Sequence, residues 1–177
     1  MQFGVCLPHR WKYASARLIA DVAQEAESLR FDSVWVTDHV IVPVHHVERG
    51  HIFYEALMTL AFVSSITRTV AMGTTVLATP TRNPVVLARE VATLDALSGG
   101  RVILGVGTGW IREELEAVGV AWTERGRFLD DEESKSCVTC GVRRGRSLSR
   151  GGTPTFERCC SNRNLLGGVG RRSGSEG

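Results

Sequence analysis

The chain has 177 residues, with 21 Lys and Arg against 19 Asp and Glu, 43% hydrophobic residues and 23% charged residues. These values are typical of about one globular domain and exclude a collagen, a coiled coil and a chain that is disordered throughout. Because no run approaches the roughly 18 apolar residues of a membrane span, and the first six residues lack the basic and apolar regions of a signal peptide, we expect a cytoplasmic protein with no membrane partner.

The charged residues divide the chain into two parts. Residues 1–133 hold 12 basic and 17 acidic side chains, whereas residues 134–177 hold nine basic and two acidic ones, together with nine of the 19 glycines and four of the five cysteines. The second part has too few large apolar residues to form a hydrophobic core. We therefore expect a folded domain over residues 1–133 and a disordered, basic tail over residues 134–177.

Apolar runs and amphipathic stretches alternate through the first half of the domain. Short strands are expected at residues 2–7 and 33–37, and helices at residues 15–29 and 54–66. One face of the first helix is expected to consist of the apolar residues at helical spacing, Leu18, Val22, Ala26 and Leu29. One side of the second helix is expected to consist of Leu57, Leu60, Ala61 and Ser64.

The same alternation continues in the second half, with strands expected at residues 69–77 and 101–106. The helix between them is expected to begin at Asn83, a favoured N-cap residue followed by proline, and to end at Gly99, a residue suited to a left-handed turn. Its inner stripe is expected to be Leu87, Val91 and Leu94. A fourth helix ending at Gly119 is expected to bury Ile111, Leu115 and Val118.

Apolar strands that alternate with amphipathic helices predict an α/β fold with a parallel sheet, built here from about four βα units. A doubly wound sheet and a (β/α)₈ barrel both begin in this way. In either fold, ligands bind at the carboxyl ends of the strands. The polar and small residues at these ends are Pro8, His9, Asp38, His39, Thr74, Thr75, Gly107, Thr108 and Gly109.

Two other patterns in the sequence suggest different sites. Gly105, Gly107 and Gly109 partly match the dinucleotide-binding fingerprint, but Trp110 stands where a further glycine is expected, so turn chemistry or a close approach of backbone to a ligand is favoured. His45, His46, Glu48 and His51 follow no common metal-ligand spacing. We therefore predict no metal site.

Three stretches resemble the luciferase-like monooxygenase superfamily, and more narrowly its oxidoreductases that use the deazaflavin coenzyme F420. They are FDSVWVTDH (31–39), GTTVLATPTRNPVVLAREVATLDALSGGRVILGVGTGW (73–110) and ERGRFLDD (124–131). The resemblance extends over residues 1 to about 131. It implies the N-terminal half of a TIM-type (β/α)₈ barrel, with the cofactor ring at the C-terminal mouth.

The resemblance also implies a set of site residues. Asp38 and His39 would approach the deazaflavin ring, and a non-proline cis peptide between Thr75 and Val76 would lie against its back face. Gly107 and Thr108 would let backbone come close to the edge of the ring. The cofactor-binding residues expected are thus Asp38, His39, Thr75, Val76, Gly107 and Thr108.

A deazaflavin transfers hydride at its C5, so the protein must orient the ring, exclude water and handle a proton. His39 is the expected catalytic residue, since an imidazole donates or accepts a proton near neutral pH. Some relatives that oxidise sugar phosphates carry an acidic residue where this chain has Trp110, which points here to an apolar or aromatic small-molecule substrate. FMN is the alternative cofactor, for a monooxygenase.

The tail has two interpretations. Cys137 and Cys140 form half of a zinc knuckle, and the basic residues would suit nucleic acid, but Cys159 and Cys160 are adjacent and the tail has no histidine. We favour a coding region read out of frame, because Arg, Gly, Ser and Cys are what a GC-rich message yields in the wrong register. Nucleic acid is therefore not an expected partner.

The family's barrel has eight strands, and its phosphate-binding loops follow the seventh and eighth. Four βα units would leave unpaired edges at the first and fourth strands, so the fragment is expected to dimerise, aggregate or stay partly molten. The sequence thus predicts a truncated F420-dependent oxidoreductase, impaired as it stands. A non-catalytic βα module that acts through self-association or a partner chain is the alternative.

Overall fold

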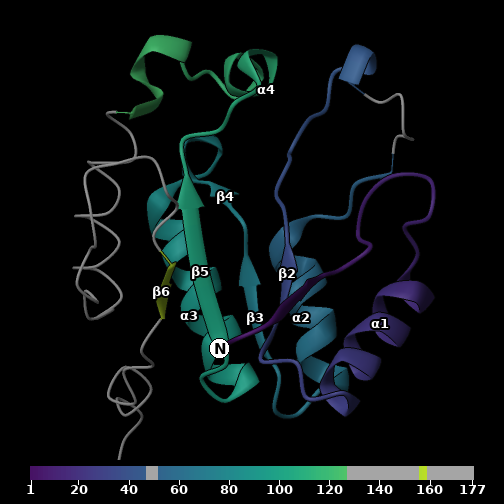
Figure 1. The fold of residues 1–177 in the computed structure, drawn as a ribbon. Helices are drawn as coiled ribbons and strands as arrows, with labels where there is room; N and C mark the ends of the chain where they lie inside the picture. The colour runs from purple at the N-terminus through teal and green to yellow at the C-terminus, as the bar shows by residue number, and fades with distance from the viewer. Residues whose placement is uncertain (47–51, 127–155, 159–177) are drawn as a thin grey trace, which may run out of the picture.

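The computed structural model describes residues 1–46 and 52–126, together with the backbone of residues 156–158 (Figure 1). The strands are β1 (Gly4–Cys6), β2 (Ser33–Val36), β3 (Ala71–Thr74), β4 (Leu77–Ala78), β5 (Val102–Gly107) and β6 (Phe156–Arg158). The helices are α1 (Ala16–Ser28), α2 (Ala56–Ile66), α3 (Pro84–Ser98) and α4 (Arg112–Ala117). Short 3-10 turns are η1 (Val44–His46), η2 (Thr79–Thr81) and η3 (Trp122–Glu124).

The strands form one parallel sheet, as the alternation of strands and helices predicts. β1, β2, β3 and β5 lie side by side in that order, and each neighbouring pair is parallel. Because every crossover passes through a helix, the carboxyl ends of these strands all point to the same end of the sheet, the upper end in Figure 1. The α/β fold with about four βα units is confirmed.

The third strand differs from its prediction. Instead of one run over residues 69–77, β3 stops at Thr74 and β4 resumes at Leu77. Both segments pair with β5, β3 near its start and β4 near its end. The N–H of Thr75 turns to the neighbouring strand and donates to the Val36 carbonyl at 2.7 Å. The apolar run alone predicts one continuous strand, whereas the cis peptide that the resemblance implies between Thr75 and Val76 falls at this interruption.

The outer edge of β5 also differs from its prediction. β6 pairs with β5 antiparallel, with Arg158 opposite Ile103 and Phe156 opposite Gly105. Ile103 also pairs with Gly73 of β3, so β6 lies on the other edge of β5. The prediction of an unpaired edge at the fourth strand is therefore wrong over these three residues. The rest of the tail that was predicted to be disordered lies outside the described residues.

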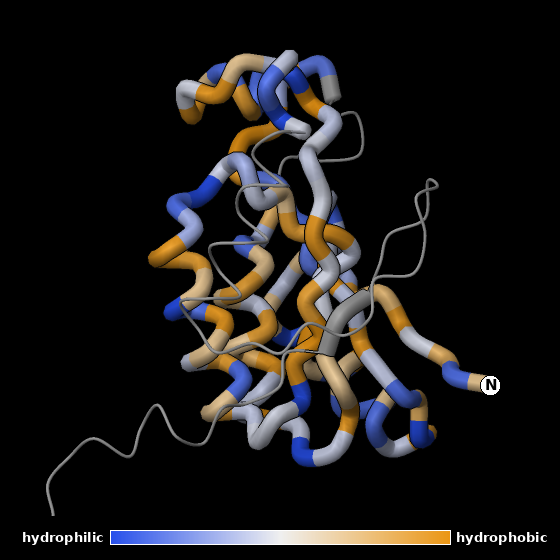
Figure 2. Tube along the Cα trace, turned by 90° about the vertical axis from the view of Figure 1, so that its left-hand side faces the viewer, coloured by the Kyte–Doolittle hydropathy of each residue, from blue (hydrophilic) through white to orange (hydrophobic). Residues whose placement is uncertain are grey.

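The hydrophobic core lies between the sheet and α1, α2 and α3, which cover one face of the sheet (Figure 1). The strands contribute alternate side chains to it, including Val34, Val36, Met72 and Val102, all at most 1% exposed. Figure 2 shows hydrophobic and hydrophilic residues interleaved along the helical layer, as expected for helices with one buried and one exposed face. The predicted inner stripe of α3 is confirmed, since Leu87, Val91 and Leu94 are all buried.

Two helices bury a face that differs from the prediction. α1 buries Ile19, Ala23 and Ala26, whereas Leu18 and Leu29 are 37% and 62% exposed. In α1 both faces carry apolar residues, and the smaller alanines let the helix approach the sheet closely. In the fourth βα unit, Ile111 and Leu115 are buried as predicted, but Val118 is 37% exposed.

The predicted start and end of α3 are both confirmed. The Asn83 side chain accepts hydrogen bonds from the N–H groups of Val85 and Val86, which satisfies two of the free donors of the first turn. At the other end, Gly99 has a φ of 78°, the left-handed conformation that closes a helix. These local signals fix where α3 begins and ends, and so where β5 starts.

The other face of the sheet is dominated by a tryptophan. The Trp35 ring lies across β1 and β3, so closely that a Cβ atom at Gly4 or Gly73 would collide with it. The Trp35 indole N–H donates to Ser33 Oγ at 2.9 Å. Glycine is therefore required on both sides of β2 for the ring to lie flat on the sheet.

At the amino ends of the strands, Glu27 closes the turn between α2 and β3. Its Oε1 accepts hydrogen bonds from the N–H groups of Arg68, Thr69 and Val70 and from the Thr69 hydroxyl, at 2.6–3.0 Å. Partial burial opposes the charge, but these hydrogen bonds outweigh it and lower the pKa of Glu27 to about 2. The carboxylate thus stabilises the folded chain in its charged form.

We expect Glu27→Gln to lower the free energy of unfolding by about 1 kcal/mol near neutral pH, because an amide is a weaker acceptor than a carboxylate and solvent screens part of the effect. The folded pKa is lower than the unfolded one. The contribution of Glu27 is therefore fully present above about pH 4.5 and disappears as the pH falls toward 2. Urea denaturation at several pH values measures this. Glu25→Gln, at an exposed position of α1, is the control, and an equal loss in both variants would contradict the assignment.

Candidate functional site

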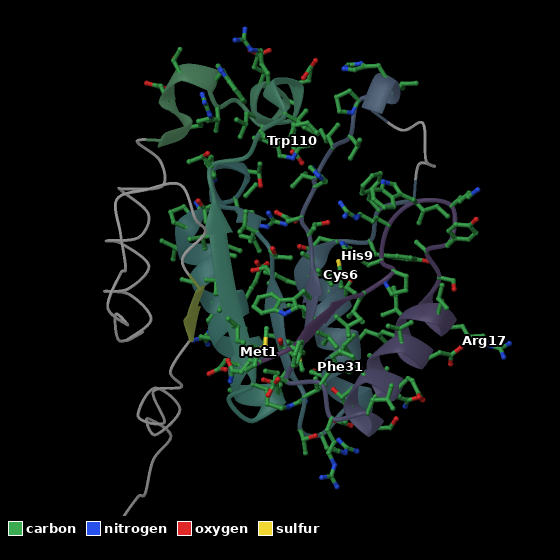
Figure 3. The ribbon with its side chains drawn as sticks, viewed as in Figure 1. Met1, Cys6, His9, Arg17, Phe31 and Trp110 are labelled. Carbon is green, nitrogen blue, oxygen red and sulfur yellow. The ribbon has the colours of Figure 1, made fainter. Side chains whose placement is uncertain are left out.

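The carboxyl ends of β1, β2, β4 and β5 form a rim that collects the residues predicted for the site. Asp38 is 5% exposed, and His39, Thr75, Val76, Gly107 and Thr108 are all partly buried. The peptide bond between Thr75 and Val76 is cis, as the resemblance implies. Trp110 lies at this same end, under α4, with His9 further along the rim (Figure 3).

Gly107 is close to Val76 across the rim. A Cβ atom at Gly107 would lie 2.5 Å from Val76 Cγ2, too close for any larger residue without movement. Next to it, the Thr74 hydroxyl donates to the Gly105 carbonyl at 2.8 Å and accepts from the Gly105 N–H at 3.0 Å. The end of β5 and the segment between β3 and β4 are therefore held in contact, with Val76 seated on Gly107.

Asp38 is engaged by an arginine that sequence reasoning missed. The Arg82 guanidinium donates two hydrogen bonds to the Asp38 carboxylate, at 2.6 and 2.8 Å, and one to Glu55 Oε1 at 2.9 Å. The Ala78 N–H also donates to Asp38, at 3.0 Å. Burial disfavours the charged guanidinium, but the two carboxylates outweigh this and raise the pKa of Arg82. Asp38 thus fixes β4 and η2 against the end of β2, and its predicted contact with a cofactor stays a prediction.

Breaking this pair is expected to be costly, because the buried Arg82 guanidinium then keeps only the more exposed Glu55 as a charged partner. We expect Asp38→Asn to lower the free energy of unfolding by about 3 kcal/mol, since the Arg82 side chain is only 13% exposed. The double variant Asp38→Asn/Arg82→Gln is expected to recover part of this loss, because no buried charge is then left poorly paired and the 39% exposed Glu55 carboxylate can be hydrated. Chemical denaturation of both variants measures the effect. A single variant as stable as the wild type would contradict it.

His39 is held by a second buried carboxylate, Glu114, at the start of α4. The His39 Nδ1–H donates to Glu114 Oε2 at 3.2 Å, and the N–H groups of Val40 and Ile41 donate to Glu114 Oε1. Glu114 is 1% exposed. Burial opposes its charge, but the hydrogen bonds from His39 and the two N–H groups outweigh it and lower the pKa of Glu114. Because Nδ1 must carry the proton it donates, Nε2 is left to act as the acceptor.

Two aromatic rings flank the His39 imidazole. Phe53 meets it edge to face at 5.8 Å between ring centres, and Trp110 does so at 5.9 Å. The Phe53 segment is itself fixed to the end of β1 by a bridge between Arg10 and Phe53 and by the Tyr54 N–H, which donates to the His9 carbonyl. The His39 side chain is consequently only 10% exposed.

His9 joins the ends of β1 and β2. It is 1% exposed, and its ring nitrogens lie 2.9 Å from the Leu7 carbonyl and 3.1 Å from the Thr37 nitrogen. Burial is the main reason why the pKa of His9 is lowered, although the backbone hydrogen bonds act in the opposite direction. A neutral His9 therefore keeps the segment before Asp38 in place.

Glu114, Arg82 and Phe53 are the rim residues that the sequence did not reveal. For Glu114 a signal existed, since it lies three residues after Ile111 and beside Leu115 on the stripe predicted to be buried. A carboxylate on a buried stripe needs donors nearby. For Arg82 and Phe53, both in connecting segments, the sequence offers no comparable signal.

The four residues weighed as metal ligands lie partly outside the described residues, which exclude Glu48 and His51 and the side chain of His46. His45 Nε2 lies 3.6 Å from Glu113 Oε1, and both side chains are exposed. Within residues 1–46 and 52–126, the structure holds no group of three His, Cys, Asp or Glu suited to a metal. In the same part of the chain, no helix is long and apolar enough to cross a membrane.

Glu114→Gln tests how the imidazole is oriented. We expect His39 to hold its proton on Nδ1 in the wild type and to populate both neutral tautomers in the variant, because an amide can donate as well as accept. Long-range ¹H–¹⁵N NMR of the imidazole distinguishes the two forms. Glu113→Gln, at the neighbouring 53% exposed side chain, should leave His39 unchanged. A single Nδ1–H tautomer in Glu114→Gln would contradict the assignment.

The fold is a parallel α/β sheet whose strand ends form the rim described above. The luciferase-like monooxygenase family matches residues 1–132, and the chain belongs to it. The F420-dependent glucose-6-phosphate dehydrogenase of Amycolatopsis mediterranei is 44% identical over 121 residues, which are 67% of this chain and 35% of that relative. The chain thus spans about a third of the length of the curated relatives it matches.

Two solved structures show the same fold. The coenzyme F420-dependent tetrahydromethanopterin reductase of Methanopyrus kandleri matches with a TM-score of 0.52 and 28% identity, over 68% of this chain and 30% of that one. A monooxygenase from Streptomyces bottropensis matches with a TM-score of 0.64 and 21% identity, over 88% of this chain and 47% of that one. The described sheet therefore corresponds to less than half of a luciferase-like (β/α)₈ barrel.

Proposed function

We propose that this chain is the N-terminal part of an F420-dependent oxidoreductase, the part that contains His39. The enzyme transfers hydride between the deazaflavin and an organic substrate. The 177-residue chain is impaired on its own. The observation that carries the proposal is the pairing of His39 with the buried Glu114 at the strand ends, 3.2 Å apart. The likeness to an F420-dependent dehydrogenase supports the choice of cofactor. FMN is the alternative cofactor.

The rim has polar groups that suit the polar edges of a flat deazaflavin ring. Thr79, at the end of β4, has a buried hydroxyl with no hydrogen-bond partner among the described residues. Gly107 lies at the end of β5 against Val76 and is followed by Thr108, and both residues are partly buried at the rim. These residues and His39 would hold the deazaflavin, which supplies the hydride-accepting carbon when bound.

A side chain of the protein must transfer the proton. A substrate alcohol that loses hydride from its carbon must also lose the proton from its oxygen. With Nδ1–H donated to Glu114, the Nε2 lone pair of His39 can accept that proton, and the Glu114 carboxylate then stabilises the imidazolium. In the reverse direction the same imidazolium returns the proton. Phe53 and Trp110 shield the imidazole from water.

A fluorescence titration of F420 with the purified 177-residue chain tests the cofactor. We expect binding at least tenfold weaker than that of the full-length Amycolatopsis mediterranei relative, because the chain spans about a third of such relatives. His39→Ala should abolish the residual binding or weaken it further. A parallel titration with FMN tests the alternative. Tight F420 binding would contradict the impairment, and preferential FMN binding would contradict the cofactor.

One observation favours the second candidate function, a non-catalytic module that associates with itself or a partner. Within the described residues β1 pairs with β2 alone, and the Trp35 face of the sheet carries no helix (Figure 1). A free strand edge can pair with another chain. Size-exclusion chromatography together with the F420 titration separates the two functions, since the enzyme requires bound cofactor and the module requires only a stable oligomer.

A further inference from the structure

The outer edge of β5 carries backbone groups that the parallel sheet does not use. Along a strand, the N–H and C=O groups of alternate residues face opposite edges. The Met72 N–H of β3 donates to the Arg101 carbonyl at 3.0 Å, and the Gly105 N–H donates to the Thr74 hydroxyl at 3.0 Å. Arg101 and Gly105 therefore direct their backbone groups toward β3. Leu104, next to Gly105, directs its N–H and C=O groups to the outer edge.

β6 meets this edge in the register that suits the outward groups. The two strands lie side by side in Figure 1, and Glu157 is directly opposite Leu104. In an antiparallel pair, residues whose N–H and C=O groups face each other alternate with residues whose groups face away. Leu104 and Glu157 are thus the pair that faces inward. The N–H groups of Phe156 and Arg158 face away from β5.

β6 covers the edge without continuing the barrel. The neighbouring pairs of β1, β2, β3 and β5 are all parallel, whereas β6 is antiparallel to β5. A (β/α)₈ barrel adds its next parallel strand at this same edge. An uncovered strand edge is a template on which another chain can pair. A segment of the same chain that occupies the edge therefore competes with such pairing.

We propose that β6 shields the edge of β5 from a second copy of this chain. Because β6 belongs to the same chain, its pairing does not depend on protein concentration, and a second copy can reach β5 only after β6 has left. Within the described residues, β1 pairs with β2 alone. One uncovered edge limits strand pairing to two copies, whereas a second uncovered edge lets further copies add by pairing β1 of one with β5 of the next.

Glu157→Pro in the 177-residue chain tests the inference, because proline lacks the N–H group that faces Leu104. In dilute protein, we expect amide hydrogen exchange at Leu104 to become at least tenfold faster, as measured by NMR. Exchange at Gly105, whose N–H donates to Thr74, should not change. In concentrated protein, light scattering should show an average mass about twofold or more above that of the wild type.

Arg158→Pro is the matched control, since the N–H group that it removes faces away from β5 and an edge strand tolerates proline at such a position. It should keep the exchange rate and the mass of the wild type. Unchanged exchange at Leu104 in Glu157→Pro, equal changes in both variants, or faster exchange without a rise in mass would each overturn the inference. Equal acceleration at Gly105 would also overturn it, because the sheet itself would then have opened.

The inference is independent of the cofactor, since neither measurement involves F420. Its failure would leave both candidate functions standing, because pairing through β1 does not require β5. Its success would show which edge of the sheet is closed to self-association.

Discussion

The hydrogen bonds of the Glu114 carboxylate are the contact on which the geometry of the rim depends. Glu114 belongs to α4, in the fourth βα unit, yet it accepts its hydrogen bonds from His39 and the two residues that follow it, in the loop after β2 of the second unit. A carboxylate that is 1% exposed is tolerated only where donors surround it. The position of α4 and the orientation of the imidazole are therefore fixed together.

Asp38, the residue before His39, also connects the end of β2 to another βα unit. Asp38 binds Arg82 and the Ala78 N–H, and so ties the end of β2 to the third unit. Asp38 and His39 thus connect the end of β2 to the third and fourth βα units. Asp38 does so through its own carboxylate, and His39 through the carboxylate of Glu114. On the side of β1, His9 accepts a hydrogen bond from the Thr37 N–H. The segment after β2 therefore contacts every other βα unit at the rim.

Local patterns predicted the elements well, because the signals for strands and for the caps at Asn83 and Gly99 lie within a few residues of the feature they determine. The face of α1 was mistaken, since Leu18 and Ile19 are equally apolar and only the approach of the sheet decides which is buried. Arg82 could not be found in this way. Its role depends on Asp38, 44 residues away, and nothing in the sequence around Arg82 indicates that contact.

The contacts that orient His39 come from residues between Asp38 and Glu114, all within the part of the chain that matches the family. Affinity for a large cofactor depends instead on a site that encloses most of the cofactor and places polar groups along it, and the relatives offer about three times the length of chain. Orientation of the imidazole and binding of the cofactor are therefore separable properties. A chain can keep the first, because the partners of the His39 and Asp38 side chains lie within residues 38–114, while the second depends on contacts outside that segment.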